Sequence, residues 1–533
     1  MTRRLLAAAS AIALFAGTAQ AEMVLHILHT NDVHSRIEPI NSSDSTCNEE
    51  QLAASECFGG VARIASKINE LRDQIKAEGG NVIVLDAGDQ YQGSLFYTTY
   101  KGKEVVEFMN AIGYDAMAVG NHEFDDGPEG LAVLADGADF PILSGNIDVT
   151  QSNILANKVF KHRVIELGDE RVGIVSALAM DTPETSSPGP NVIFQDDIDS
   201  LKAAVDELNA EGVDKIIALT HAGYGRDQEF AASVPGIDAI VGGHSHTLLG
   251  DMEGASGSYP TMVAGPEGQE VPVVQAYGYG RYLGHLTLTF DDQGHVTSVE
   301  GHPILLDATV AEDEAIKARV AEMAEPINEL REKVVARTSA PIDGDRANCR
   351  VRECEMGNLV ADAMVDRVAE QGVTIAIQNG GGLRASIDEG DVTMGEIYTV
   401  LPFQNTLATF RLSGADVIAA LENGASQYEE QAGRFAQVSG LKYTVDPAAE
   451  AGARISGVMI EAEGEWVPID EAATYGVATN NYMRGGGDGY DIFAQNGQDA
   501  YDFGPDLAEV VADYLGARDS DYAPYTDGRV TLK

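Results

Sequence analysis

The stretch MVLHILHTNDVH, residues 23–34, places an apolar run directly before the polar residues Asp32 and His34. A short run rich in Val, Ile and Leu is typical of a buried β-strand. The polar residues then fall where the carboxyl end of that strand opens into a loop. Because ligands of α/β sheets bind at that edge, this segment predicts both a strand and one corner of a binding site.

The same arrangement recurs further along the chain. The apolar segments are NVIVLDAG (81–88), DAMAVG (115–120), DKIIALT (214–220) and IDAIVGG (237–243), and VGIVSALA (172–179) resembles them. Segments 59–79 and 198–212, which lie among them, have helical spacing of apolar residues. Strands that alternate with helices predict an α/β domain, which we expect to continue to about Asp307.

Polar residues that commonly bind metals follow five of these predicted strands. They comprise two aspartates, one asparagine and four histidines: Asp32, His34, Asp89, Asn121, His221, His244 and His246. Such donors suit a hard or borderline divalent cation. A single Asp-x-His occurs by chance, whereas the whole set at successive strand ends predicts a metal centre. Six other histidines lack this setting and are assigned no chemistry, namely His26, His29, His162, His285, His295 and His302.

The later part of the chain indicates a connector and a second domain. Residues 311–337 have the composition of a helix, with a bend expected at Pro326. The predicted division is therefore a leader at 1–21, a first domain at 22–310, a connector helix at 311–337 and a second domain at 338–533. Apolar strands flank the glycine-rich segments 379–384 and 481–490, which indicates tight loops rather than flexible linkers.

The charge balance excludes some classes of partner. Among 533 residues, 35 Lys and Arg face 84 Asp and Glu, which gives a formal net charge of −49. A field of that sign repels nucleic-acid polymers and anionic lipid surfaces. It also opposes small phosphates, so a phosphate site in this chain requires strong local cations. We therefore expect no nucleic-acid partner.

The N-terminus resembles an export signal. Arg3 and Arg4 precede an apolar stretch from Leu5 to Ala16, and Ala19-Gln20-Ala21 is a small-x-small cleavage site. We favour the general secretory route over the twin-arginine route. No later stretch is long and apolar enough for a membrane span, and the polar C-terminus offers no lipid-anchor signal. A periplasmic or secreted protein without a stable membrane anchor is expected.

The four cysteines fit an exported protein. They form two pairs that are close in sequence, Cys47 with Cys57 and Cys349 with Cys354. Export permits disulfides, and although four cysteines allow three connectivities, we favour this local pairing. The loops enclosed are short, so these bonds would shape loops more than they stabilise the fold.

These segments together resemble the 5'-nucleotidase family. TNDVHSR (30–36), GGVARI (59–64), DAGDQYQGS (86–94), GNHEFD (120–125), THAGYG (220–225) and GGHSHT (242–247) are similar to its metallophosphoesterase motifs. CRVREC–EMGNL (349–359), NGGGLR (379–384), LPFQN (401–405) and NYMRGGGDGY (481–490) are similar to its nucleotide-binding domain. The resemblance covers the mature chain and is closest to the ecto-5'-nucleotidase branch. It implies a four-layer αββα metallophosphoesterase domain, a helical connector and a C-terminal α/β substrate domain.

The resemblance implies a division of roles among the ligands. Asp32, His34 and His246 would bind one divalent metal, Asn121, His221 and His244 a second, and Asp89 would bridge the two. Zinc, manganese and cobalt all suit this set. Some bacterial relatives have Gln where this chain has His246, an exchange that would alter metal preference.

The resemblance also implies catalytic and substrate-binding roles. Phosphorus would be attacked in line by water without a covalent phosphoenzyme, while His122, oriented by Asp125, stabilises the phosphoryl oxygens or the leaving group. The second domain would select the substrate through Arg350 and Arg384 for phosphate, Asn379 in the glycine-rich loop, Phe403 and Tyr482 as a base clamp, and Asp488 for ribose hydroxyls. A site shared by two domains implies a domain rotation between open and closed forms.

The predicted function is hydrolysis of nucleoside 5'-monophosphates, AMP among them, to nucleoside and phosphate. Relatives with the same metal domain cleave nucleotide diphosphates, UDP-sugars, 2',3'-cyclic nucleotides or sulfur esters. A base clamp disfavours only the sulfur substrates. A non-catalytic exported nucleotide-binding protein is the alternative of another class, and the full set of chemical residues opposes it. Oligomeric state stays open, with a homodimer as one option.

Overall fold

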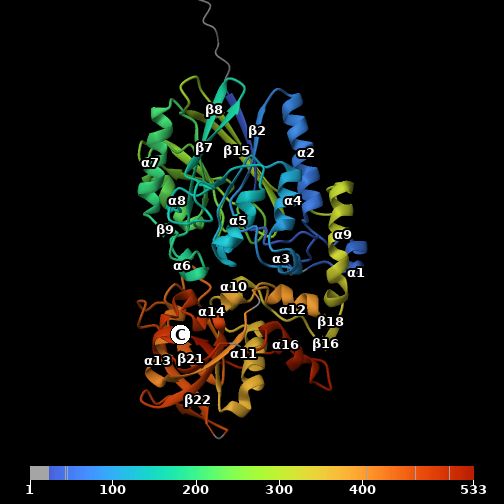
Figure 1. The fold of residues 1–533 in the computed structure, drawn as a ribbon, viewed down its shortest axis with the longest axis vertical. Helices are drawn as coiled ribbons and strands as arrows, with labels where there is room; N and C mark the ends of the chain where they lie inside the picture. Colours follow the sequence, from blue (N-terminus) through green and yellow to red (C-terminus); the bar gives the residue numbers. More distant parts are fainter. Residues whose placement is uncertain (1–22, 43, 45, 404, 463, 503) are drawn as a thin grey trace, which may run out of the picture.

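The computed structural model describes residues 23–533 except Ser43, Ser45, Gln404, Glu463 and Phe503, and it does not describe the side chains of Glu184 and Thr185. The expected leader, residues 1–21, lies outside the described residues. Figure 1 shows two domains, with residues up to about 310 in the upper one and the rest of the chain after helix α9 in the lower one. Within the described residues no helix is long and apolar enough to cross a membrane.

The first domain contains two central sheets. The first has the order β15-β14-β1-β2-β3-β4-β6. Its strands are β1 (Met23–Thr30), β2 (Asn81–Asp86), β3 (Ala116–Ala118), β4 (Ile142–Leu143), β6 (Val159–Phe160), β14 (Tyr282–Phe290) and β15 (Val296–Leu305). Strands β1 to β4 and β6 run parallel, whereas β14 pairs antiparallel with β1 and β15. The strand predicted from residues 23–30 is therefore central to this sheet.

The second sheet of this domain has the order β12-β13-β11-β10-β8-β7. Its strands are β7 (His162–Leu167), β8 (Glu170–Leu178), β10 (Ile216–His221), β11 (Ala239–Val241), β12 (Thr261–Ala264) and β13 (Glu270–Val274). Strands β8, β10, β11 and β13 run parallel. Strands β5 (Ile147–Asp148) and β9 (Ile193–Phe194) form a separate small pair.

Three apolar clusters explain the layering. One lies between the two sheets and includes Leu25, Ile83 and Ile217. A second joins the first sheet to its helices, and a third joins the second sheet to α7 and α8. The helices are α1 (Glu49–Ala54), α2 (Val61–Ala77), α3 (Leu95–Tyr100), α4 (Lys103–Ile112), α5 (Gly127–Gly137), α6 (Thr182–Thr185), α7 (Asp197–Ala210) and α8 (Tyr224–Ser233). Helix, sheet, sheet and helix layers match the predicted αββα order.

The connector differs in part from its prediction. Helix α9 spans Glu314–Arg331 and contains Pro326, but Val334–Thr338 forms strand β16 instead of the end of a helix. β16 pairs with β18 (Gly390–Thr393) of the second domain, and the adjacent β-branched residues Val334 and Val335 favour that strand. α9 packs on the first domain through Val320, Met323 and Ile327.

The second domain is also α/β. One sheet has the order β20-β17-β24-β19-β25 and another β23-β22-β21-β26. The strands are β17 (Ile375–Asn379), β19 (Leu407–Ser413), β20 (Ala436–Ser439), β21 (Leu441–Val445), β22 (Ile455–Ala462), β23 (Glu465–Pro468), β24 (Thr474–Asn480), β25 (Gln498–Tyr501) and β26 (Val530–Leu532). Helices α11 (Glu355–Val368), α13 (Gly414–Ala425), α15 (Asp491–Asn496) and α16 (Leu507–Gly516) pack on these sheets.

Short helices of both domains meet at the boundary. Figure 1 shows α6 and α3 of the upper domain facing α10, α12 and α14 of the lower one. The lower helices are α10 (Arg346–Cys349), α12 (Met394–Val400) and α14 (Asn481–Arg484). Because the predicted metal ligands and the predicted substrate residues lie on these facing surfaces, the boundary is where a site can form.

Candidate metal centre and active site

Strand ends of both sheets supply the predicted metal ligands. Asp32 and His34 follow β1, Asp89 follows β2 and Asn121 follows β3, all in the first sheet. His221 is the last residue of β10, and His244 and His246 follow β11, both in the second sheet. Since these strands are parallel within each sheet, their carboxyl ends bring the seven side chains together, as the sequence predicts.

The first group of donors consists of Asp32, His34 and His246. Nε2 of His34 lies 3.0 Å from Nε2 of His246. Nε2 of His246 lies 3.2 Å from Oδ1 of Asp32. All three side chains are buried and their donor atoms are close enough together to share one ion.

The second group consists of Asn121, His221 and His244. Oδ1 of Asn121 lies 2.9 Å from Nδ1 of His244 and 3.2 Å from Nε2 of His221. Oδ2 of Asp89 lies 3.1 Å from Nε2 of His221 and 3.9 Å from Nε2 of His34, so it stands between the two groups. This is the position that a bridging carboxylate requires.

The backbone fixes which nitrogen of each imidazole faces the centre. Nδ1 of His34 lies 3.1 Å from the carbonyl oxygen of Tyr91, and Nδ1 of His221 lies 2.7 Å from that of Ala87. A carbonyl accepts only an N–H, so Nε2 of each ring carries the lone pair that a metal needs. Several ligands also have left-handed backbone conformations, which cluster at functional sites: Asp32, His34, Asp89, His244 and His246.

The protonation states fit a cation site. Burial and then the charge of Arg384 hold the pKa of His34 well below its usual range, and burial lowers that of His244 to about 3. Although burial opposes it, the imidazoles of His221 and His122 hold the pKa of Asp89 well below normal. These neutral imidazoles and the ionised carboxylate are metal-binding forms. His221 differs: burial lowers its pKa, but Asp89 and Asp32 outweigh burial and raise that pKa to about 10, so this ring must lose a proton when a metal binds. The donors fit two divalent cations, and nitrogen with carboxylate oxygen admits zinc, manganese or cobalt.

His122 and Asp125 form a close pair beside these groups. Nδ1 of His122 lies 2.6 Å from Oδ2 of Asp125, and the His122 backbone N–H donates to Oδ1 of Asp89 at 2.9 Å. Burial lowers the pKa of His122, but Asp125 and Asp89 outweigh it and raise that pKa overall. Nε2 of His122 is 3.9 Å from Oδ2 of Asp89. By distance alone, His34, Asp89 and His122 could also share a metal ion. The charged form and the bond to Asp125 favour an acid or hydrogen-bond donor.

Arginines of the second domain reach over the metal ligands. Nη2 of Arg384 donates to Nε2 of His34 at 3.0 Å, and Nη1 lies 3.4 Å from Nε2 of His122. Arg350 is buried and its Nε has no hydrogen-bond partner among the described residues. Both line a cavity of about 1670 Å³ that also contains Asp89 and Asn121. Arg350 and Arg384 therefore provide the local positive charge that this acidic protein needs in order to bind an anion such as phosphate.

The remaining predicted substrate residues lie at the same cavity. The ring of Phe403 stacks on that of His122 with 5.5 Å between centroids. Asn379 donates through Nδ2 to Oδ2 of Asp488 at 2.6 Å, and the Tyr482 hydroxyl donates to Oδ1 of Asp488 at 3.2 Å. The structure thus brings together every predicted substrate residue, while the base clamp stays a prediction.

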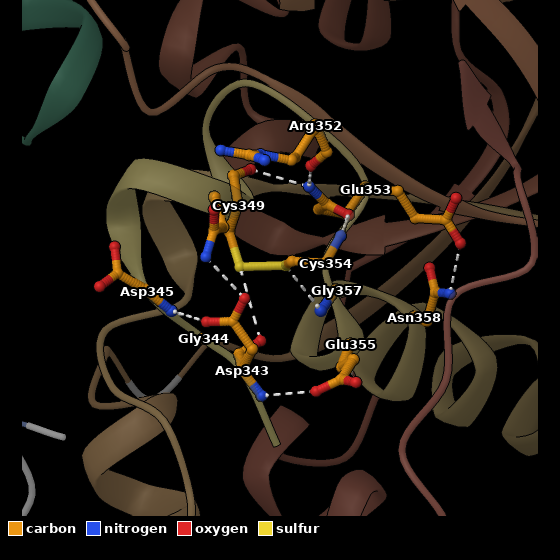
Figure 2. The surroundings of a disulfide bond; sticks show 12 residues. Asp343, Gly344, Asp345, Cys349, Arg352, Glu353, Cys354, Glu355, Gly357 and Asn358 are labelled. Carbon is orange, nitrogen blue, oxygen red and sulfur yellow. Dashed lines mark hydrogen bonds between the residues drawn. A yellow bond between two sulfur atoms is a disulfide. The ribbon is translucent and has the colours of Figure 1, made fainter. Parts of the chain in front are cut away.

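The two predicted disulfides are confirmed. Cys47 bonds to Cys57, and Cys349 bonds to Cys354. Figure 2 shows the second bond at the start of helix α11, whose N-cap is Cys354. The bond closes a short loop that contains Arg350. The Gln437 side chain donates to the carbonyl oxygens of Cys349 and Arg352 at 2.8 and 2.7 Å, which holds that loop in place.

Three further residues of this region, which the sequence did not single out, support the site. Arg346 lines the cavity one helical turn before Arg350, a spacing that could have indicated it. Glu123 accepts the backbone N–H groups of Gly120, Asp89, Gln90 and Tyr91, which fixes the two ligand loops to each other. Ser186 donates to Asp125 at 2.7 Å, and no feature of its sequence marks it.

Comparisons with known proteins agree with this geometry. Residues 25–248 match the family described as calcineurin-like phosphoesterase, and residues 334–495 match the 5'-nucleotidase C-terminal domain. The 5'-nucleotidase of Homo sapiens is 39% identical over 95% of this chain and 90% of its own, and the snake venom 5'-nucleotidase of Gloydius brevicauda is 38% identical over 95% and 88%. The structure of a 5'-nucleotidase precursor from Thermus thermophilus superposes with a TM-score of 0.90 at 41% identity, covering 96% of this chain and 99% of that one.

Proposed function

Because the chain belongs to the 5'-nucleotidase family, we propose that it is an exported two-metal enzyme that hydrolyses nucleoside 5'-monophosphates to nucleoside and phosphate. It is a phosphoric monoester hydrolase that acts on 5'-nucleotides, as its relatives' names indicate. The proposal adds the residues that do the chemistry and the monophosphate as substrate.

One observation carries the proposal. Metal-binding donors of the first domain and arginines of the second line the same cavity, which includes Asp89, Asn121, Arg350 and Arg384. Metal ions on one side of the cavity and arginines on the other would attract a phosphate group. Such local positive charge is needed because the negative net charge of the protein repels anions. A binding protein without catalysis would not need the His122–Asp125 pair between them.

The metals would be held by Asp32, His34 and His246 on one side and by Asn121, His221 and His244 on the other, with Asp89 shared. When bound, two divalent cations lower the pKa of water and offset negative charge on a phosphate. The remaining work falls to side chains of this chain.

His122 would act on the phosphate or on the leaving oxygen. Its raised pKa favours the imidazolium, and Nδ1 is engaged by Asp125, so Nε2 is the atom that faces the cavity. An N–H at that position donates to an oxygen on which negative charge develops. Arg350 and Arg384 would hold the non-reacting phosphate oxygens with planar, permanently charged groups.

The nucleoside would lie toward the second domain. Phe403 and Tyr482 offer aromatic rings for a base, and stacking on such rings contributes about 1–3 kcal/mol per base. Asp488 would accept from ribose hydroxyls, replacing its bond to the Tyr482 hydroxyl. Because stacking suits any base, we expect a broad base preference.

A second class of substrate is favoured by the size of the cavity. Its volume, about 1670 Å³, exceeds the roughly 300–1,000 Å³ of ordinary ligand pockets. The site therefore has room for a nucleoside diphosphate or a nucleotide-sugar conjugate beside the monophosphate.

Export is supported by the two disulfides, which form in oxidising compartments, and by the leader-like residues 1–21. The snake venom relative is named for a secreted fluid. Mass spectrometry of the mature N-terminus after periplasmic fractionation tests this point, and a chain that still begins at Met1 would refute cleavage.

The function is tested by phosphate release from AMP, ADP, UDP-glucose and 2',3'-cyclic AMP, with the protein as isolated, after chelation, and after readdition of zinc, manganese or cobalt. Release from AMP that a chelator abolishes and a metal restores is the expected result. Undiminished release by the metal-free protein would refute the mechanism, and a preference for UDP-glucose or the cyclic nucleotide would refute the substrate assignment.

A further inference from the structure

The Asp125 carboxylate is held at both oxygens. Oδ2 lies 2.6 Å from Nδ1 of His122, and Oδ1 accepts a hydrogen bond of 2.7 Å from the hydroxyl of Ser186. Ser186 and His122 are both buried, each with less than a tenth of its surface exposed. The three side chains form one continuous chain of hydrogen bonds that ends at the cavity.

The second bond has a definite physical effect on the first. A carboxylate that is held at one oxygen can rotate about its Cβ–Cγ bond, and the imidazole that follows it would lose its fixed direction. A charge-assisted bond to the second oxygen removes that freedom. We propose that Ser186 is a positioning residue, which fixes Asp125 and through it the direction in which His122 presents Nε2 to the substrate. The inference rests on the proposed function, because it presupposes that His122 acts in the reaction.

The location of Ser186 connects this chain to the second domain. Ser186 is the residue directly after α6, and α6 contacts the short 3-10 helix at Gly487–Gly489. Figure 1 shows α6 at the boundary between the domains, above α14. The 3-10 helix contains Asp488, which we assign to the ribose. The helix α6 therefore connects the loop that contains Asp488 to Ser186, which directly follows α6 and holds Asp125.

Charge also links this segment to the second domain. Asp181 lies directly before α6. Burial raises the pKa of Asp181, and the nearby guanidinium of Arg434, from the second domain, partly offsets that increase. Residues at both ends of α6 therefore interact with side chains that line the cavity, Asp181 with Arg434 before the helix and Ser186 with Asp125 after it.

The test compares Ser186→Ala with Ser200→Ala, which also removes one hydroxyl hydrogen bond, to the backbone carbonyl of Asp196, but does so on α7 outside the lining of the cavity. Alanine is smaller than serine, so the variant introduces no clash and should fold. Loss of a hydrogen bond to a charged group should lower kcat for AMP by about 10- to 100-fold. KM should change by less than about twofold, because the Ser186 hydroxyl already donates its proton to Asp125, and metal content should remain that of the parent protein. Ser200→Ala should match the parent in all three measurements.

A double-mutant cycle with Asp125→Ala decides the mechanism. If Ser186 acts through Asp125, adding Ser186→Ala to Asp125→Ala should cause no further loss of kcat, because the carboxylate that it positions is gone. An unchanged kcat in Ser186→Ala, a loss that falls on KM, or losses that multiply in the double variant would each overturn the inference. If Asp125→Ala itself retains full kcat, the proposed role of the His122–Asp125 pair fails. If only Ser186→Ala is silent, the proposed function stands and this inference alone is wrong.

Discussion

Removal of Arg346 should separate the phosphate-binding role of the arginines from their effect on stability. Arg346 lines the cavity beside Arg350 and Arg384. Its charge helps to lower the pKa of His244 and His246, so the guanidinium lies near the metal ligands. Among the described residues no carboxylate forms an ion pair with it. Its partner is therefore expected to be the phosphate of the substrate.

The structure sets the size of the effect. A hydrogen bond to a charged group contributes about 1.5–3 kcal/mol, and each 1.4 kcal/mol corresponds to about a tenfold change. Arg346→Ala should thus lower kcat/KM by about 10- to 150-fold. The loss should be the same for AMP and for p-nitrophenyl phosphate, because both carry the phosphate. Arg346→Lys keeps the charge but loses the planar fork, so its loss should be smaller.

Stability should change in the opposite direction. Burial, partly offset by Tyr279, and then the charge of Arg384 lower the pKa of Arg346, which means that the folded protein disfavours its positive charge. Without phosphate, Arg346→Ala should therefore melt about 2–4 °C higher than the parent, the shift that about 1 kcal/mol produces in a domain of this size. Steady-state kinetics on both esters and calorimetry in phosphate-free buffer measure the two effects. A loss confined to AMP, or a lower melting temperature, would refute the reasoning.

Three further results are expected. His122→Ala should lower kcat by about 10²–10⁴ with metal content unchanged, and loss of a metal would show instead that this imidazole is a ligand. Phe403→Ala with Tyr482→Ala should reduce kcat/KM for AMP far more than for p-nitrophenyl phosphate, and equal losses would mean that the rings are structural. Burial and then His26 lower the pKa of His285 to about 4 from 6.5. As the pH falls below 6.5, His285 takes up a proton in the unfolded chain but not in the folded protein, which shifts the equilibrium toward unfolding. The stability contributed by the neutral ring above pH 6.5 is therefore lost as the pH falls toward 4. His285→Gln should flatten that decline in urea titrations, and an unchanged slope would contradict it.

The metal centre could be predicted because its signal is local. Each ligand lies within a few residues of an apolar strand, and parallel strands of one sheet end at a common edge. Asp32 and Asp89 of the first sheet, and His221 and His244 of the second, could therefore be brought together without coordinates. The left-handed backbone conformations of Asp32 and His244 could not be predicted in this way. The sequence does not show how sharply each loop turns to direct its side chain toward the metal centre.

The residues that were missed depend on packing between distant segments. Ser186 matters only because α6 lies beside Asp125, which is 61 residues earlier in the chain. Glu123 was passed over beside its conspicuous neighbour His122, although its carboxylate fixes both ligand loops. The connector was misjudged at its end because β16, which begins at Val334, pairs with a strand nearly sixty residues later, a partner that helical spacing cannot reveal.

The Cys349–Cys354 bond (Figure 2) has a practical consequence for making the protein. It spans a sequence separation of only 5, so it restricts the unfolded chain less than a bond across a long loop would, and protein produced with reduced thiols should still fold, although it should melt a few degrees lower. The ring that it closes contains Arg350, however, and a relaxed ring would present that guanidinium loosely. Recombinant material from a reducing cytoplasm could then be pure and folded while binding its substrate poorly. A thiol count, rather than a melting curve, is the appropriate release criterion for such preparations.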